Sequence, residues 1–188
     1  MAVAPGHYRL GPDRGRIVLR TFRDGLAAQA GHDLIIDVTR WSGGFTVDDD
    51  KSLTAIVARM DMTSLVVREG TGGIKPLTDR DRREIATTAR RLLSVDRHPE
   101  ASFAASRFHA AGDDGGTMDG TFTLRGLARP LRVQVSQVGP GRYRTTGTVV
   151  QSSYGIKPYT AFLGALKVRD AVDFEAEAEL PAQPDDPE

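Results

Sequence analysis

The chain has 188 residues, and its 25 Lys and Arg residues balance 25 Asp and Glu residues, so the formal net charge is zero. This balance gives no global attraction to nucleic acid or to an acidic membrane. Because the chain has no cysteine, a disulfide framework, a thiolate metal site and a cysteine nucleophile are excluded.

The first third of the chain predicts strands. Residues 16–23 are a first strand candidate, residues 33–40 place Leu34, Ile36 and Val38 on one face, and residues 53–62 are almost continuously apolar. Phe45 and Val47 predict a short strand between the second and the last of these, after a break at the glycine pair 43–44.

One helix is predicted after a Gly- and Pro-containing loop. Thr78 is a good N-cap, and Asp79 and Asp81 place negative charge in the first turn, where the helix dipole favours it. We expect the pair 98–99, His-Pro, to end the helix. Apolar residues follow the cap at helical spacing, namely Ile85, Ala89, Leu92 and Leu93.

The second half of the chain predicts five further strands, at residues 101–108, 120–125, 131–138, 142–150 and 171–180. In the last of them apolar residues alternate with Asp and Glu, as in a strand with one dry and one wet face. Residues 126–130 are expected to close a hairpin. Residues 181–188 are acidic and proline-rich, and we expect a disordered tail.

Eight or nine short strands with one inserted helix indicate an all-β fold, an antiparallel barrel or sandwich that residues 1–180 form as a single domain. A barrel of about eight strands has an interior that side chains fill or that holds one elongated ligand. Small residues such as Gly147, Ala176 and Ala178 leave space there, whereas the phenylalanines fill it, so the pattern leaves both outcomes open. Residues 151–168 do not alternate, and we expect a loop over the barrel opening, as core packing or as a ligand portal.

No catalytic or metal-binding pattern stands out. His7, His32, His98 and His109 are scattered without the spacing of a metal site. There is no GxSxG nucleophile motif, and the loop at residues 70–76 lacks the order of a phosphate-binding loop. We therefore expect no enzyme activity and no cofactor.

Three segments together resemble the YceI-like, polyisoprenoid-binding family. They are 98–108 (HPEASFAASRF), 120–133 (GTFTLRGLARPLRV) and 154–180 (YGIKPYTAFLGALKVRDAVDFEAEAEL). The resemblance implies a lipocalin-like barrel of eight antiparallel strands with a helix packed on it. It also implies that the pore binds a long isoprenoid chain, that of a polyprenyl phosphate or a quinone, for transport, storage or sequestration.

The resemblance also bears on compartment and partners. Many members of the family are periplasmic or secreted, but residues 1–13 lack the features of a signal peptide, and no segment is long enough to span a bilayer. We therefore expect a soluble, cytoplasmic protein with a lipid ligand and no nucleic-acid partner. Homodimerisation is an expectation by family analogy alone.

Candidate ligand-binding residues follow from the strand faces and the resemblance together. The predicted interior wall consists of Phe22, Leu34, Ile36, Phe45, Phe103, Phe122, Leu124, Val133, Tyr143, Phe162 and Phe174. The predicted portal or head-group residues are Arg59, Tyr154, Lys157 and Tyr159.

Two other functions stay open at this point. An enzyme acting on a lipid or a small acid would need a polar cluster inside the barrel, for instance His32 with Asp61 or Arg59. A structural or interaction module would have a filled core and would use a sheet edge or the Arg-rich face of the helix as its contact surface.

Overall fold

The computed structural model describes residues 4–49, 53–112, 115–181 and 183–185. Most of these residues belong to one antiparallel sheet of eleven strands. Its strands are β1 (Gly6–Leu10), β2 (Gly15–Thr21), β4 (His32–Val38), β5 (Trp41–Val47), β6 (Leu53–Asp61), β7 (Leu65–Gly72), β8 (Glu100–Ala110), β9 (Gly115–Leu124), β10 (Leu127–Gly139), β11 (Arg142–Val150) and β14 (Ala171–Glu179).

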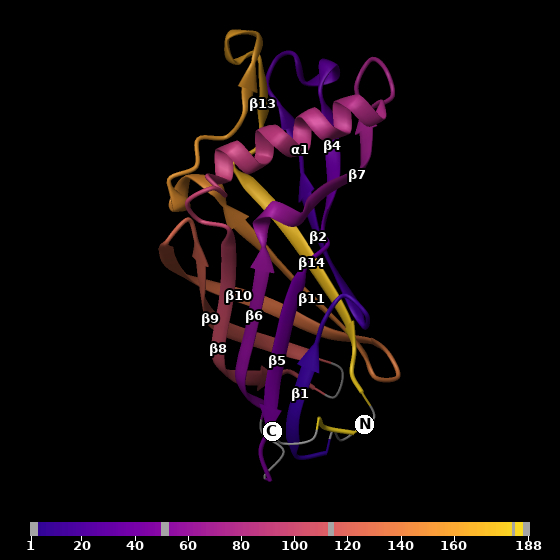
Figure 1. The fold of residues 1–188 in the computed structure, drawn as a ribbon, viewed down its shortest axis with the longest axis vertical. Helices are drawn as coiled ribbons and strands as arrows, with labels where there is room; N and C mark the ends of the chain where they lie inside the picture. The colour runs from indigo at the N-terminus through magenta and orange to yellow at the C-terminus, as the bar shows by residue number, and fades with distance from the viewer. Residues whose placement is uncertain (1–3, 50–52, 113–114, 182, 186–188) are drawn as a thin grey trace.

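The sheet curls around an elongated interior. Its strand order is β1-β5-β6-β8-β9-β10-β11-β14-β2-β4-β7, and Figure 1 shows β10 and β11 crossing behind β5, β6 and β8. A second, three-stranded sheet pairs β3 (Arg23–Asp24) with β13 (Leu166–Val168) and β12 (Thr160–Ala161) at the upper end. Four short 3-10 turns interrupt the strands: η1 (Ala28–Ala30), η2 (Met62–Ser64), η3 (Gln151–Tyr154) and η4 (Phe162–Gly164).

The predicted all-β fold with one inserted helix is confirmed, but the expected number of about eight strands is too low. The additional strands are β1 and β7, and β5 also runs through the glycine pair 43–44, where we expected a break. Gly44 is needed there because a Cβ atom would lie 2.9 Å from the backbone oxygen of Tyr8 on β1. These glycines therefore allow two strands to approach closely and do not end one.

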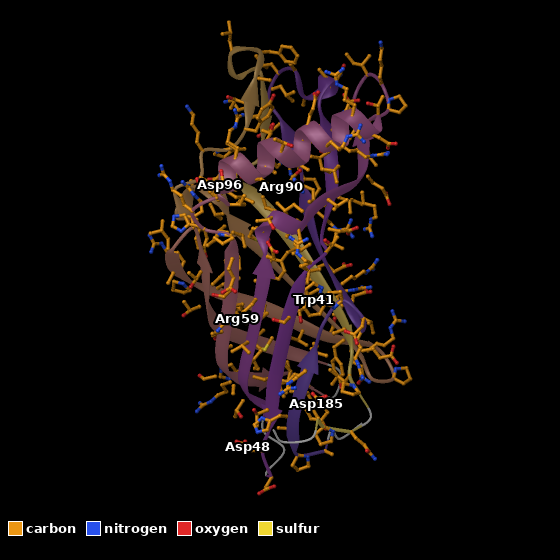
Figure 2. The ribbon with its side chains drawn as sticks, viewed as in Figure 1. Trp41, Asp48, Arg59, Arg90, Asp96 and Asp185 are labelled. Carbon is orange, nitrogen blue, oxygen red and sulfur yellow. The ribbon has the colours of Figure 1, made fainter. Side chains whose placement is uncertain are left out.

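Helix α1 (Asp79–Leu93) lies across the upper part of the sheet (Figure 1). Thr78 caps it as predicted and forms a capping box with Asp81. The helix ends before the expected His-Pro pair, because Ser94 adopts a left-handed conformation (φ 55°) and its N–H closes the last turn. Arg90, labelled in Figure 2, donates a hydrogen bond to the Leu65 carbonyl on β7 (2.8 Å) and ties the helix to the sheet.

The hairpin between β9 and β10 is tighter than the sequence suggested. Arg125 and Gly126 alone form the turn, with φ values of 52° and 74°. This geometry suits the twist of an antiparallel pair. Pro130, which we expected in the loop, lies in β10 opposite Thr121.

Strand β14 shows how charge is distributed on the outside of the sheet. Glu177 lies between Arg16 of β2 and Arg144 of β11, with ion-pair distances of 3.0 and 2.5 Å. The hydrogen bond from Arg144 is the main reason that the pKa of Glu177 lies below its usual range, and burial opposes this shift in part. The apolar residues of the same strand face the interior, as their alternation predicted.

Residues 183–185 of the acidic tail are described, and Asp185 lies beside β1, whereas the disorder expected of the tail as a whole stays a prediction. The N–H of Asp185 donates to the His7 carbonyl (2.8 Å), and the Asp185 carboxylate accepts from the Arg9 N–H (2.5 Å). The physical reason is that β1 is an edge strand with unpaired backbone groups, which a passing segment satisfies. Residues 182 and 186–188 of the predicted tail lie outside the described residues.

Candidate functional site

The interior is hollow beneath the helix. A cavity of about 760 Å³, here called the upper cavity, lies between α1 and the sheet. Ile85, Ala89 and Leu92 line it from the helix, and Leu34 and Ile36 of β4 line it from the sheet. The apolar face of α1 therefore forms one wall of this cavity.

A second hollow, here called the lower cavity, fills the other half of the interior and has a volume of about 470 Å³. Trp41, labelled in Figure 2, and Phe45 line it from β5, and Phe103 lines it from β8. Val133 of β10 and Tyr143 of β11 form the opposite wall. Its surface is predominantly apolar, so it suits a hydrocarbon chain and not a polar group.

The two cavities adjoin at a layer of shared side chains, here called the waist. Five side chains that border both cavities form it: Leu19, Met62, Phe122, Val149 and Phe174. They come from β2, η2, β9, β11 and β14, so the waist is a ring around the interior. An extended ligand that occupied both cavities would pass through this ring.

The sheet register fixes the position of Phe174 in the waist. Phe174 pairs with Gly147 of β11 on one side and with Leu19 of β2 on the other. A Cβ atom at Gly147 would lie 2.7 Å from two carbons of the Phe174 ring, so the ring lies directly over this glycine. The missing side chain of Gly147 therefore provides the space that Phe174 occupies.

The other aromatic ring of the waist, that of Phe122, packs against a buried tyrosine. Tyr154 packs edge-on against Phe122, with the ring centroids 5.7 Å apart and the planes at 77°. Tyr154 is buried, and this burial raises the pKa of its hydroxyl group. Tyr154 is thus a packing residue that orients Phe122.

The upper cavity is also lined by charged side chains, both basic ones and the carboxylates Asp81 and Glu84 of α1. Lys75, Tyr159 and Lys167 line the cavity and are themselves exposed, which places the mouth at this end. Neither ammonium group has a carboxylate partner within the described residues. Thr21 also lines the cavity, and its buried Oγ1 has no hydrogen-bond partner in the described part of the chain.

Most of the predicted wall residues border a cavity. Leu34, Ile36 and Leu124 line the upper cavity, whereas Phe45, Phe103, Val133 and Tyr143 line the lower one. Phe122 and Phe174 border both.

Two predicted wall residues lie elsewhere. Phe22 follows β2, whose odd-numbered residues face inward, so its side chain lies outside and stacks under the Arg169 guanidinium at 5.6 Å. Phe162 lies in η4 and is 67% exposed. Phe22 was assigned to the wrong face because the predicted strand register was shifted by one residue. The orientation of Phe162 could not be predicted because the backbone around it is irregular and has no periodic pattern.

The predicted portal residues are also divided. Tyr159 lines the upper cavity at its mouth, but Tyr154 is in the core. Lys157 is exposed and lines neither cavity. Arg59, labelled in Figure 2, is an outward residue of β6 and pairs with Glu100 (3.4 Å), because the inward positions of that strand are the even-numbered ones.

The polar cluster that an enzyme would need is not assembled from the residues we considered. His32 Nε2 donates to the Lys75 carbonyl oxygen (2.8 Å) at the mouth. Asp61 instead caps η2 and pairs with Arg40 (2.8 Å), and hydrogen bonds from Thr63 and Arg40 lower its pKa.

Sequence reasoning missed the parts of the wall that strands do not provide. The helix face around Ile85 and Ala89, Met62 of η2, and the buried Ile156 all line the upper cavity. The amphipathic pattern of the helix was visible in the sequence, but nothing in it indicated that a cavity would separate this face from the sheet.

Two negative observations complete the description. Among the described residues, no group of three or more His, Cys, Asp or Glu side chains is placed to hold a metal ion. Within the same residues, no helix is both long and apolar enough to cross a bilayer.

Comparison with known proteins identifies the fold. A family model described as YceI-like domain matches residues 15–180. A search of curated proteins found no similar sequence.

Several solved structures share this architecture at low sequence identity. BcnA of Burkholderia cenocepacia is 14% identical with a TM-score of 0.60, and the match covers 90% of this chain and 99% of that one. A polyisoprenoid binding domain from Saccharophagus degradans is 12% identical with a TM-score of 0.54, covering 95% and 100% of the two chains. The YceI protein of Campylobacter jejuni is 13% identical with a TM-score of 0.56, covering 76% and 81%.

Proposed function

The chain belongs to the YceI-like domain family, and from this premise we propose that it binds one long-chain isoprenoid lipid inside the curled sheet, as a carrier, store or sequestering protein. The observation that carries the proposal is the pair of apolar cavities, of about 760 and 470 Å³, that meet at the waist. The similar domain from Saccharophagus degradans, described as polyisoprenoid binding, supports the same ligand class.

The shape and chemistry of the interior favour a flexible hydrocarbon chain. Ligand sites usually enclose about 300–1,000 Å³ and combine apolar walls with a few polar groups. Here charged side chains line the upper cavity, and predominantly apolar walls continue beyond the waist in the lower cavity. A chain buried in this way gains about 25 cal/mol for each Å² of apolar surface removed from water, without directional contacts.

The mouth favours an anionic head group. Lys75 and Lys167 line the upper cavity, and neither forms an ion pair in the described residues. Asp81 and Glu84 line it too, but Asp81 is engaged in the helix cap with Thr78 and Glu84 pairs with Arg80 (2.9 Å). An ammonium group binds a phosphate more strongly than a neutral quinone ring. Thr21 Oγ1, buried without a partner, offers one further hydrogen bond. We therefore favour a polyprenyl phosphate over a quinone.

The filled-core alternative is less consistent with this interior, because side chains leave two large hollows in it. The proposed binding wall consists of the predicted residues that border a cavity, together with the side chains of the waist and the helix. Tyr159 remains a proposed portal residue, and Lys75 and Lys167 take the head-group role that we had expected of Arg59 and Lys157.

Native mass spectrometry of the protein purified from cells tests this proposal. We expect a retained lipid of several hundred daltons that organic extraction removes. The variant Ala89→Phe, which extends a ring into the upper cavity from α1, should lose most of the retained lipid. The matched control Thr87→Phe, on the exposed side of the same helix, should keep it.

A clean mass without lipid, together with no uptake of a polyprenyl phosphate by the extracted protein, would refute the proposal. Equal lipid retention in both phenylalanine variants would show that the ligand lies outside the upper cavity.

A further inference from the structure

Three loops lie together around the mouth of the upper cavity. They comprise residues 25–31, 72–78 and 157–167, and they project from the upper end of the molecule (Figure 1). The N–H of Ala27 donates to the Ala165 carbonyl (2.9 Å), and His32 beside the first loop donates to the Lys75 carbonyl in the second (2.8 Å). The loops therefore form one connected rim.

The rim exposes large apolar side chains at its tips. Leu26 and Leu163 are fully exposed, Ile74 is 79% exposed, and Phe162 is 67% exposed. Among the large apolar side chains of the described residues, these four are the most exposed, and all of them are in the rim. Apolar side chains that gather on one surface and touch nothing indicate an interaction site.

The backbone of the third loop adopts an unfavourable conformation at its two exposed apolar residues. Phe162 and Leu163 have φ values of 50° and 54°, in the left-handed region that bulky side chains disfavour. Leu163 is fully exposed, so no packing of its side chain compensates for this conformation. Strain of this kind persists where function requires it.

The rim is also positively charged, although the chain as a whole is neutral. It contains Lys75, Lys157 and Lys167, which are three of the four lysines in the sequence, and no Asp or Glu. Three carboxylates beside the rim form ion pairs with arginines: Asp33 with Arg23 (3.8 Å), Asp79 with Arg82 (2.8 Å) and Glu84 with Arg80 (2.9 Å).

We propose that this rim docks on the surface of an anionic lipid bilayer. The apolar tips enter the head-group region, the lysines contact lipid phosphates, and the mouth of the upper cavity then faces the membrane. A combination of apolar insertion and basic charge is what binds a protein to such a surface. A second copy of the chain fits less well, because pairing this face with itself would bring three lysines against three lysines.

This proposal goes beyond ligand binding and does not depend on which lipid the interior holds. It predicts where the protein exchanges a lipid, namely at a membrane surface through the rim. Docking is measured on the protein without added ligand, so its failure and a failure of lipid binding are separate results.

Co-sedimentation with phosphatidylcholine vesicles, with and without phosphatidylglycerol, tests the proposal. We expect the protein to bind the anionic vesicles. The double variant Phe162→Asn/Leu163→Asn should weaken this binding by about tenfold or more, because two apolar side chains no longer enter the bilayer. Lys157→Gln should weaken it by about fivefold on anionic vesicles and leave the weak binding to neutral vesicles unchanged.

The asparagine variant separates docking from folding. Asparagine adopts the left-handed conformation more readily than Phe or Leu, so the unfolding temperature of the double variant should equal or exceed that of the wild type. A matched control, Val66→Ser/Val138→Ser, removes two exposed apolar side chains from β7 and β10 and should bind vesicles as the wild type does. Lipid retention in native mass spectrometry should be the same in the asparagine variant as in the wild type.

Three results would overturn the proposal. The first is that the wild type does not bind anionic vesicles, and the second is that the asparagine variant binds them as well as the wild type. The third is a dimer in light scattering that this variant abolishes while vesicle binding persists, which would assign the rim to a second copy of the chain.

Discussion

Phe174→Ala is the substitution that most directly probes the waist. Phe174 borders both cavities, and its ring lies over Gly147. Removing the ring joins the upper and lower cavities, because the facing position on β11 has no side chain to replace it. The substitution therefore alters the passage between the cavities and leaves the mouth unchanged.

The expected size of the effect follows from this position. Truncation of a buried phenylalanine to alanine costs about 3–5 kcal/mol, and we expect about 3 kcal/mol here because the ring already borders open space on two sides. A long chain that gains two methylene contacts by passing the waist more freely would gain about 1.6 kcal/mol at about 0.8 kcal/mol each. That corresponds to about 15-fold tighter binding.

The assay compares two prenyl alcohols of different length, farnesol and solanesol, titrated into the extracted protein. For Phe174→Ala we expect about 15-fold tighter binding of solanesol and less than about a threefold change for farnesol, which fits in the upper cavity. Phe22→Ala is the control, since Phe22 packs outside the cavities against Arg169. If both alcohols responded equally to Phe174→Ala, or neither did, the waist would not lie on the path of the chain.

Three further predictions concern stability. Gly147→Ala should destabilise the protein by about 1–3 kcal/mol in urea unfolding, since its Cβ would displace the Phe174 ring, and an unchanged midpoint would contradict the packing described here. Glu177→Gln should lower the free energy of unfolding at neutral pH. Because the pKa of Glu177 is lowered in the folded state, its stabilising contribution is present above the ordinary glutamate pKa and is lost as the pH falls through the lowered value. The free energies of unfolding of wild type and variant, measured against pH, should therefore converge in acid and not in base. Thr78→Ala removes the helix cap and should cost about 1 kcal/mol in the same measurement, whereas Thr78→Ser should restore most of it.

The strands that alternate strictly were predictable because one of their faces is dry. The pattern of β14 placed Phe174 inside and Glu177 outside, and the structure agrees. The helix was predictable from Thr78 and the carboxylates of its first turn. Strand alternation and helix capping depend only on residues that are close together in the chain, so they can be predicted from the sequence.

The parts that depend on tertiary approach were not predictable. The glycines of β5 suggested a break, but they permit β1 to approach, and Gly70 and Gly72 of β7 suggested a loop although they belong to a strand. The waist combines residues from five elements that are far apart in the chain. No local pattern indicates that Met62 and Phe122 border the same opening.

The candidate site shows the same division. Most of the apolar side chains chosen on regular strands border a cavity, whereas Arg59 of β6 points outward and the residues chosen in the irregular segment lie in different places. Tyr154 and Phe162 are both aromatic residues in one loop, yet one is buried against Phe122 and the other is exposed at the rim. Only the path of the backbone through η3 and η4 separates their roles.

The proposed binding mode requires that one isoprenoid chain occupies both cavities and passes the waist. A crystal structure of the extracted protein reloaded with a polyprenyl phosphate tests it most directly. We predict continuous electron density for the chain from the lysines at the mouth, between Phe122 and Phe174, into the lower cavity. An empty interior, or a chain bound on the outer surface of the sheet, would contradict the account.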